Sequence, residues 1–194
     1  EEQSHQVDLP LPGEVLEGAK VEGVVNKLPK FNQSNIDTLK PGKWLDYIII
    51  DVYLYTILKS VSEKQDIIQF SANNDQDIYS QKKMKQLISE HKISVIPSWY
   101  NNHWSMIIVK NSTIYYFNSQ KNSKSPYDSH ILGPFKDYDM KIVNVAFSQQ
   151  CTLEDCGVYT CFIVKCMLVD EKHYCSLSCF DAIEFRKAMM EEVK

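Results

Sequence analysis

The sequence predicts a single α+β domain, in which helical segments come first, a sheet follows, and further helices close the chain. Three observations lead to this prediction. Two stretches of helical length lie in the first half, four short runs rich in β-branched and aromatic residues lie in the middle, and the last quarter returns to helical length. Separate groups of helices and strands are typical of α+β folds. The 194 residues, of which 44% are hydrophobic, are enough to build one core.

The first 35 residues differ from the rest and predict an arm laid over the domain. They show little periodicity and are interrupted by turn-forming residues, namely Pro10, Pro12, Gly13, Gly18, Gly23 and Pro29. We therefore expect an N-terminal arm or extension over residues 1–35 and a folded domain over residues 36–194.

Three segments have the length and apolar pattern of helices besides the cysteine-rich one described below. Residues 43–58 follow the turn at Pro41-Gly42 and are apolar enough for a buried helix of about four turns. Residues 78–91 and 180–192 are amphipathic instead. The side chains expected to face the core from these two helices are Met84, Leu87, Ile88, Ile183, Phe185 and Met189.

Short runs of β-branched and aromatic residues predict a sheet in the middle of the chain. The expected strands are residues 93–97, 104–109, 114–117 and 142–147. The segments expected around them are a short extended stretch at 67–70, a turn at 73–75, a loop at 121–126 and an irregular segment at 131–138.

Charge and hydropathy exclude several classes of function. The formal net charge of −4 disfavours a general nucleic-acid binder. No apolar run approaches the roughly 18 residues of a membrane-spanning helix, and no signal peptide is visible, so we expect neither a membrane span nor an anchor.

All six cysteines fall in the last quarter of the chain, unlike the disulfide framework of a small secreted domain. They are Cys151, Cys156, Cys161, Cys166, Cys175 and Cys179. The first four are spaced five residues apart, whereas zinc sites use paired short spacings, so we expect no metal. We expect an intracellular, reducing compartment instead.

Cys156 is the candidate nucleophile. A polar loop over residues 148–155 leads into an apolar stretch over residues 156–169, which predicts a buried helix with Cys156 in its first turn. Free N–H groups and the positive dipole end of a helix favour a thiolate, so we expect a lowered pKa for Cys156. Cys151 lies in the loop and Cys161 lies inside the helix, where a thiol is usually inert.

His103 and Asn118 are the candidate partners of that thiol. His103 begins one predicted strand and Asn118 ends the next. A two-residue hairpin turn at Lys110-Asn111 would pair the two directly, and a four-residue loop would shift the register by two but keep both side chains on one face of the sheet. A three-residue loop would instead turn Asn118 away. With both side chains on one face, Asn118 could orient the imidazole of His103 as a base, in a cysteine, histidine, asparagine triad.

These motifs together resemble the Ulp and sentrin-specific protease family, cysteine peptidases of clan CE that cleave ubiquitin-like proteins after a terminal Gly-Gly. The resemblance extends from about residue 43 to residue 166. The matching pieces are Trp44-Leu45 before a helix, Ile96-Pro97 followed by His103-Trp104-Ser105, Tyr116-Phe117-Asn118-Ser119, and Gln149-Gln150 six to seven residues before Asp155-Cys156-Gly157-Val158-Tyr159.

The resemblance implies a papain-like or adenain-like fold, in which the nucleophile helix packs against a mostly antiparallel sheet that carries His103 and Asn118. It implies Cys156 as nucleophile, His103 as general base and Gln150 as donor to the oxyanion. Trp44 and Trp104 match a pair of tryptophans that roof a narrow tunnel over the Gly-Gly. Trp99 matches no motif and is expected to be a packing residue. The implied partner is ubiquitin or a ubiquitin-like protein such as SUMO. We expect the enzyme to be monomeric and to need no cofactor.

Two departures from the family pattern bear on activity. Asn118 replaces the usual aspartate, so slower turnover is expected, and Asn118→Asp is expected to retain or raise activity. Asp46-Tyr47 stands at the position where the sentrin-specific members that the chain resembles have Asn-Asp, so a polar contact to the modifier is expected to be altered.

Other interpretations of the same motifs remain open at this stage. A non-catalytic modifier-binding domain is compatible with Asn118, and a viral-type maturation protease acting on unfolded peptides is compatible with the triad. Acetyltransferases share the fold in bacterial pathogens, as do deubiquitinases, but they would be expected to carry a basic cofactor pocket. No Lys/Arg cluster lies near the motifs. The compartment would be the cytoplasm or nucleus, or the host cytosol for a pathogen effector.

Overall fold

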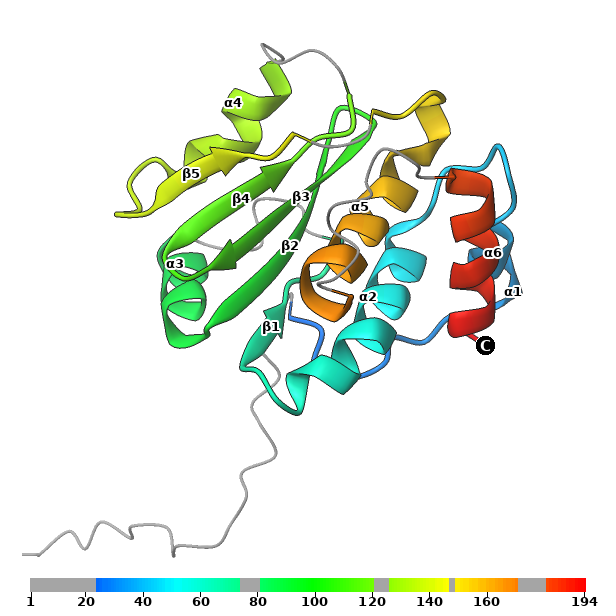
Figure 1. Cartoon of the computed structure of the whole chain (residues 1–194), viewed down its shortest axis with the longest axis horizontal. Helices are drawn as coiled ribbons and strands as arrows, with labels where there is room; N and C mark the ends of the chain where they lie inside the picture. The colour runs from blue at the N-terminus through cyan, green and yellow to red at the C-terminus, as the bar shows by residue number, and fades with distance from the viewer. Residues whose placement is uncertain (1–23, 74–80, 121–125, 147–148, 171–180) are drawn as a thin grey trace, which may run out of the picture.

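Five strands form one mixed sheet with helices packed against both of its faces (Figure 1). The computed structural model of the chain describes residues 24–73, 81–120, 126–146, 149–170 and 181–194. The strands follow one another across the sheet in chain order, as β1 Ile67–Gln69, β2 Ile93–Tyr100, β3 His103–Lys110, β4 Thr113–Phe117 and β5 Lys141–Asn144. The central pairs are antiparallel and the two outer pairs are parallel. The α+β prediction is confirmed, and each segment expected to be extended contains a strand.

The helices lie before, between and after these strands. They are α1 Gln33–Asp37, α2 Tyr47–Ser62, α3 Gln81–Glu90, α4 Pro126–Leu132, α5 Cys156–Val164 and α6 Ala182–Glu192. Short 3₁₀ turns form at η1 Gly133–Phe135 and η2 Leu153–Asp155, and a π-helical turn, η3 Lys165–Val169, continues α5. No helix among the described residues is long and apolar enough to cross a membrane.

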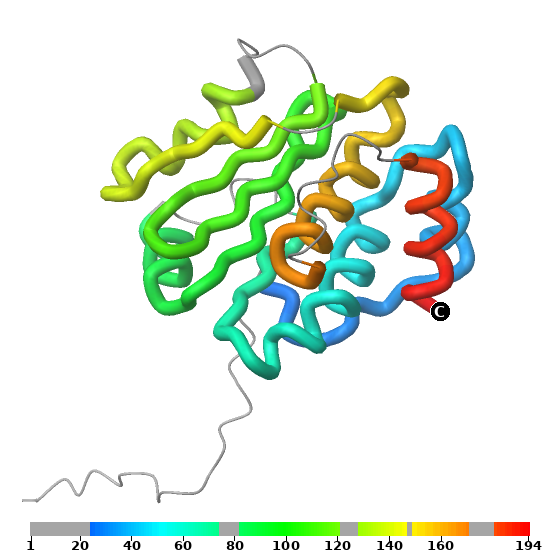
Figure 2. The backbone as a smooth tube through the Cα atoms, viewed as in Figure 1, coloured from blue at the N-terminus to red at the C-terminus, as the bar shows by residue number. Residues whose placement is uncertain are grey.

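Two hydrophobic cores lie on opposite faces of the sheet, because successive residues of a strand point to opposite sides. Met106 and Ile108 of β3 pack with α2, α5 and α6, whereas Ile107 and Val109 pack with α3, α4 and η1. The tube in Figure 2 shows α5 running between the sheet and α2, with α6 on the outside. Helix α5 is therefore enclosed on both sides, which agrees with its uniformly apolar sequence.

Tight turns place the predicted site residues at the ends of β3 and β4. Asn101 and Asn102 both adopt positive φ, so β2 turns directly into β3 and His103 becomes its first residue. The next turn uses Asn111 and Ser112, with φ of 53° and 54°, and Lys110 pairs with Thr113. The expected turn at Lys110-Asn111 is therefore wrong, and the register shifts by two residues.

The shift leaves the predicted face unchanged. Met106 pairs with Phe117, so the same register places Asn118 opposite Ser105 and two residues along from His103. Side chains two residues apart on one strand share a face. Asn118 and His103 therefore meet diagonally across the pair rather than directly.

The helices and their buried side chains depart from the sequence predictions in several places. Residues 43–46 lie outside α2, because the Asp46 carboxylate accepts a hydrogen bond from the Ile49 N–H at 2.8 Å and caps the helix there. Helix α4 begins at the last residue of the loop expected at 121–126 and extends into the irregular segment expected at 131–138, which also contains η1. The prediction that Ile183 faces the core is wrong, since its side chain is 52% exposed and α6 buries Phe185, Arg186 and Met189 instead.

The described end of the expected arm lies along the sheet. Val24 forms an isolated antiparallel bridge with Phe70, and the Val25 N–H donates to the Gln69 carbonyl at 2.9 Å. Residues 33–35 belong to α1. Residues 1–23 lie outside the described part of the chain, as do residues 74 and 75 of the expected turn and residues 121–125 of the expected loop.

Candidate active site

Cys156 begins α5 at the point where this helix meets the start of β3. Its side chain is completely buried, and the backbone N–H groups of Trp104, Gly157 and Cys156 itself lie close enough to its sulfur to favour the thiolate. Trp104 directly follows His103, so the thiol lies beside the strand end that carries the candidate base.

Gly157 permits this close approach of α5 to its neighbours. A Cβ atom at this position would lie 3.1 Å from Leu45 Cβ and 3.3 Å from Trp104 Cδ1. Contacts this short require a neighbour to move, and Cβ of Leu45 is fixed to its backbone. The glycine after the cysteine is therefore a packing requirement at the helix start.

Burial dominates the acidity of the candidate nucleophile. Loss of solvent raises the pKa of the Cys156 thiol to about 11, although the three backbone N–H groups act in the opposite direction. The expectation of a lowered pKa at the helix start is therefore wrong. Burial likewise lowers the pKa of His103, while Asn118 and Asp128 raise it in part. A neutral thiol beside a neutral imidazole is the resting state that these shifts favour.

His103 and Asn118 come together as predicted. His103 Nε2 lies 2.9 Å from Asn118 Oδ1. An amide oxygen can only accept, so Nε2 carries the hydrogen of the neutral imidazole. This leaves the lone pair on Nδ1, the nitrogen that a base must use.

Asn118 is held by two further groups. Its Oδ1 also accepts from the Gln120 N–H at 2.9 Å, and its Nδ2 donates to Asp128 Oδ1 at 3.0 Å. Asp128 belongs to α4, and the hydroxyl of Tyr116 donates to the same carboxylate oxygen at 2.8 Å. Asp128 was not predicted from the sequence, because nothing in its local pattern links it to the end of β4.

Gln150 is fixed against the end of β4 by Ser119. The Gln150 N–H donates to the Ser119 carbonyl at 2.9 Å, and the Ser119 hydroxyl donates to Gln150 Oε1 at 2.5 Å. Its amide nitrogen donates to the carbonyls of Thr152 at 2.8 Å and Leu153 at 3.4 Å. The predicted oxyanion donor thus lies on the loop that leads into Cys156, with its N–H groups turned toward that loop.

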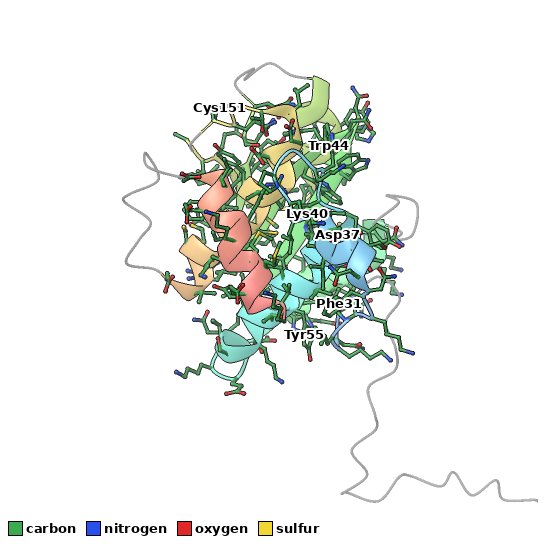
Figure 3. All side chains as sticks on the ribbon, turned by 90° about the vertical axis from the view of Figure 1, so that its right-hand side faces the viewer. Phe31, Asp37, Lys40, Trp44, Tyr55 and Cys151 are labelled. Carbon is green, nitrogen blue, oxygen red and sulfur yellow. The ribbon has the colours of Figure 1, made fainter. Side chains whose placement is uncertain are left out.

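Three tryptophans gather beside the start of α5. Trp99 lies between the other two, with ring centroids 6.2 Å from Trp44 and 4.8 Å from Trp104. Trp44 and Trp99 are 41% and 36% exposed, whereas Trp104 is buried and its Nε1 has no hydrogen-bond partner among the described residues. Trp44 and Cys151 both lie toward the end of the molecule where α5 begins (Figure 3). Trp99 therefore joins the predicted pair.

The two predicted modifier contacts at the start of α2 differ in their surroundings. The Asp46 carboxylate caps α2 and also accepts from Asn35 Nδ2 at 2.7 Å, so both of its oxygens have partners within the chain. Tyr47 is 41% exposed.

Arg186 holds the residue that precedes the nucleophile. Its guanidinium bonds to Asp155 Oδ1 at 2.7 and 3.0 Å from two nitrogens, and both groups are largely buried. The remaining donors reach backbone carbonyls, those of Thr38, Lys40, Lys43 and Glu154. One side chain of α6 thus fixes the start of α5 to the segment between α1 and α2.

The described cysteines differ sharply in exposure, and none of them forms a disulfide. Cys151 is exposed, whereas Cys156, Cys161 and Cys166 are buried. Cys175 and Cys179 lie outside the described residues. Within the described ranges, no three His, Cys, Asp or Glu side chains are grouped as they would be around a metal ion.

Solved structures of SUMO proteases share this fold. The chain matches the SUMO protease Ulp1 with its catalytic cysteine oxidised to a sulfinic acid at a TM-score of 0.69 and 20% identity, over 87% of this chain and 88% of that one. It matches the C-terminal Ulp1 protease domain in complex with Smt3, the yeast ortholog of SUMO, at 0.63 and 22%, over 82% and 80%.

A bacterial effector is also similar. The chain matches XopD from Xanthomonas campestris, solved bound to ubiquitin, at a TM-score of 0.51 and 15% identity, over 95% of this chain and 98% of that one. No protein-family model matches the sequence, and no curated protein sequence matches it. The structural likenesses confirm the cysteine-protease fold that the sequence motifs imply.

Proposed function

We propose that this chain is a cysteine peptidase and isopeptidase that cleaves after the C-terminal Gly-Gly of ubiquitin or of a ubiquitin-like modifier such as SUMO. One observation supports this proposal more strongly than any other. The His103 imidazole bonds to Asn118 through Nε2, and the backbone N–H of the next residue, Trp104, lies beside the Cys156 sulfur. A base with an oriented tautomer therefore lies next to a thiol, which is the arrangement that nucleophilic catalysis needs.

The reaction would follow from the neutral resting pair. As the Cys156 sulfur attacks the carbonyl carbon of the terminal glycine, the thiol proton moves to His103 Nδ1 and an oxyanion forms. Collapse of the tetrahedral intermediate breaks the C–N bond, and His103 returns the proton to the leaving lysine amine. Water then attacks the thioester with His103 as base, which releases the modifier carboxylate and restores the thiol.

Gln150 is the proposed oxyanion donor. Its amide nitrogen has two hydrogens, and the contact to the Leu153 carbonyl, at 3.4 Å, is the longer of the two that it makes. Exchange of this weak contact for the oxyanion would retain the bond to Thr152. Stabilisation of this kind typically contributes a hundredfold or more to the rate.

Burial of the thiol supports specificity for a slim substrate tail. Cys156 has no exposed surface, and the tryptophans flank it on the outside. A tail without Cβ atoms can pass under such a roof, whereas larger side chains would clash. Two consecutive glycines at the end of a modifier meet this requirement.

The remaining features of the proposal concern its setting. The partners would be the modifier and its conjugates, bound by a monomeric domain over residues 36–194, with Trp44, Trp104, Asp46 and Tyr47 at the contact. The buried free thiols are compatible with a reducing intracellular compartment.

Hydrolysis of modifier substrates tests the proposal. Ubiquitin and SUMO, each carrying a fluorogenic amine on the terminal glycine, are incubated with the wild-type chain, with Cys156→Ala and with Cys151→Ala. We expect the wild type to release the fluorogenic amine and Cys156→Ala to release none. Cys151→Ala should release it as the wild type does, because Cys151 is exposed and is not part of the Cys156–His103 pair.

Two outcomes would contradict the proposal. Equal release by Cys156→Ala would remove Cys156 as nucleophile. Tight binding of a modifier by the wild type without any release would favour a non-catalytic binding domain, and transfer of an acetyl group from acetyl-coenzyme A to a protein would favour an acetyltransferase.

A further inference from the structure

Asn118 connects the candidate base, His103, to the carboxylate of Asp128 through two hydrogen bonds. His103 Nε2 bonds to Asn118 Oδ1 at 2.9 Å, and Asn118 Nδ2 bonds to Asp128 Oδ1 at 3.0 Å. The chain His103, Asn118, Asp128 therefore runs from the end of β3, across the end of β4, to α4. Asp128 matches none of the sequence motifs, and its helix lies between a predicted loop and a predicted irregular segment.

We infer that Asp128 is a positioning residue of the active site, which orients the Asn118 amide and supplies, through it, the negative charge that a triad aspartate would otherwise provide. The inference rests on the proposed function, because it assigns a role in the same reaction.

The orientation of Asn118 follows from the chemistry of its neighbours. A carboxylate only accepts hydrogen bonds, so Asp128 requires the NH₂ end of the Asn118 amide. The oxygen end must then face His103, where the Gln120 N–H also bonds to it. With the amide reversed, its NH₂ group would face Nε2 and favour the tautomer whose proton is on Nδ1. Asp128 thus sets the tautomer of His103 through two successive hydrogen bonds, both made by Asn118.

Tyr116 keeps the carboxylate of Asp128 in place. Its hydroxyl donates to Asp128 Oδ1 at 2.8 Å, and its side chain is buried in the core on that face of the sheet. Burial and the nearby Asp128 carboxylate raise the pKa of Tyr116 well above its usual range, so the hydroxyl stays protonated and acts as a donor. One oxygen of Asp128 therefore accepts two hydrogen bonds, from Tyr116 and from Asn118.

The charge of Asp128 also acts on the imidazole. Its field raises the pKa of His103 and so opposes part of the effect of burial. Ionisable side chains near this site in the described part of the chain include Cys156 on α5, Tyr116 on β4, Tyr100 on β2 and His130 on α4, and His130 is exposed and stacks on Tyr100. An imidazolium forms while the thiol proton is on His103, and the Asp128 charge stabilises it through the polar amide of Asn118.

This arrangement changes the expectation for Asn118→Asp. The substitution would place two carboxylates about 3 Å apart, and like charges at such a distance cannot both stay ionised without a large cost. We therefore expect Asn118→Asp to lower activity. Asn118→Asp combined with Asp128→Asn would restore a single negative charge, now next to His103, and an amide beside it.

The test compares variants that separate charge from geometry. In Asp128→Asn the new amide oxygen can still accept from Asn118 and Tyr116, so only the charge is lost. We expect kcat for the modifier substrates to fall about tenfold to a hundredfold with KM unchanged, the range seen for outer partners of metal-bound histidines. The His103 titration, followed by NMR, should move to lower pH. Asp139→Asn removes an exposed carboxylate outside the site and should change neither quantity.

The swapped pair keeps the test decisive if one variant folds poorly. The double variant should exceed Asn118→Asp in kcat, with circular dichroism as the check of folding. Equal kcat and an equal His103 titration in wild type and Asp128→Asn would overturn the inference, as would an Asn118→Asp variant more active than the double variant. The NMR titration needs no substrate, so it tests the role of Asp128 even if the wild type cleaves no modifier and the proposed function fails.

Discussion

At the scale of single residues, burial determines the protonation states of the candidate site. Cys156 has no exposed surface and His103 is almost completely buried. Desolvation disfavours both the thiolate and the imidazolium, so the pKa of the first is raised and that of the second is lowered. The chemistry of the site must therefore begin from uncharged partners and move the proton during the attack.

The pH dependence of the reaction follows from these shifts. The base must be neutral to accept the thiol proton, and its pKa lies below the ordinary value of 6.5. We expect kcat/KM to rise with pH along an acid limb whose midpoint lies below 6.5, and to stay level through neutrality. Steady-state hydrolysis over a pH series measures this limb, and a midpoint above 6.5 would contradict the assignment of His103 as a desolvated base.

Trp99 provides a second prediction at this scale. It lies between Trp44 and Trp104 and is partly exposed, so it can contact a bound modifier tail. We expect Trp99→Ala to raise KM for modifier substrates about tenfold, as for other interface tryptophans, and Trp99→Phe to raise it less.

Alkylation of Cys156 separates this role from damage to the site. In a Cys151→Ala background, which removes the exposed thiol, iodoacetamide should modify Cys156 at the same rate with and without the Trp99→Ala substitution. A slower alkylation together with an unchanged KM would show that Trp99 supports the thiol and not the substrate.

The sequence allowed prediction of the residues that belong to fixed local patterns. His103 and Asn118 lie at strand ends. The predicted turn is wrong by a register shift of two residues, and a shift by an even number leaves both side chains on the same face of the sheet. The pKa of Cys156 could not be predicted, because the helix-start argument omits the loss of solvent that only the packed structure reveals.

At the scale of elements, the position of α5 depends on close packing against α2. Gly157 is the contact point, because a Cβ atom there would lie 3.4 Å from Ile50 of α2, 3.1 Å from Leu45 just before that helix and 3.3 Å from Trp104. This contact brings the start of α5 up to β3 and so brings Cys156 to the N–H of Trp104.

We expect Gly157→Ala to destabilise the fold by about 1–3 kcal/mol, because the added methyl group overpacks this contact. Gly133→Ala is the matched control, since an added Cβ there meets no heavy atom within 4 Å. Urea unfolding measures both. A Gly157→Ala variant as stable as the wild type would mean that α2 and α5 can separate without cost.

Helix α4, like the short α1, was not predicted from the sequence. It has seven residues, and the segment around it has the composition of turn and loop. A helix this short gains its stability mainly from tertiary packing, here against the α3 side of the sheet through Ile131. Because α4 was missing from the expected elements, Asp128 was missing from the expected site.

At the scale of the whole molecule, Arg186 connects segments that are far apart in the sequence. Its guanidinium joins α6 to Asp155 and to the backbone before α2. No periodic pattern predicts such a contact, because a buried arginine in an amphipathic helix looks like any solvated basic residue.

We expect Arg186→Leu to destabilise the protein by about 3–5 kcal/mol, since it removes the cation paired with the largely buried Asp155 carboxylate and the donor to several carbonyls. Lys187→Met is the control. Lys187 is exposed and pairs with Glu184 one turn away, so its loss should change stability little. Thermal unfolding distinguishes the two, and similar losses would show that Arg186 does not organise the start of α5.

The central claim is that Cys156 attacks the end of a modifier tail with His103 as its base. The most direct measurement is the reaction of the whole chain with ubiquitin and SUMO probes that carry an electrophile in place of the terminal glycine, followed by mass spectrometric mapping of the adduct. The account predicts one adduct, on Cys156, which is slowed in His103→Gln and persists in Cys151→Ala. An adduct on Cys151 or another thiol, or no adduct with either probe, would contradict it.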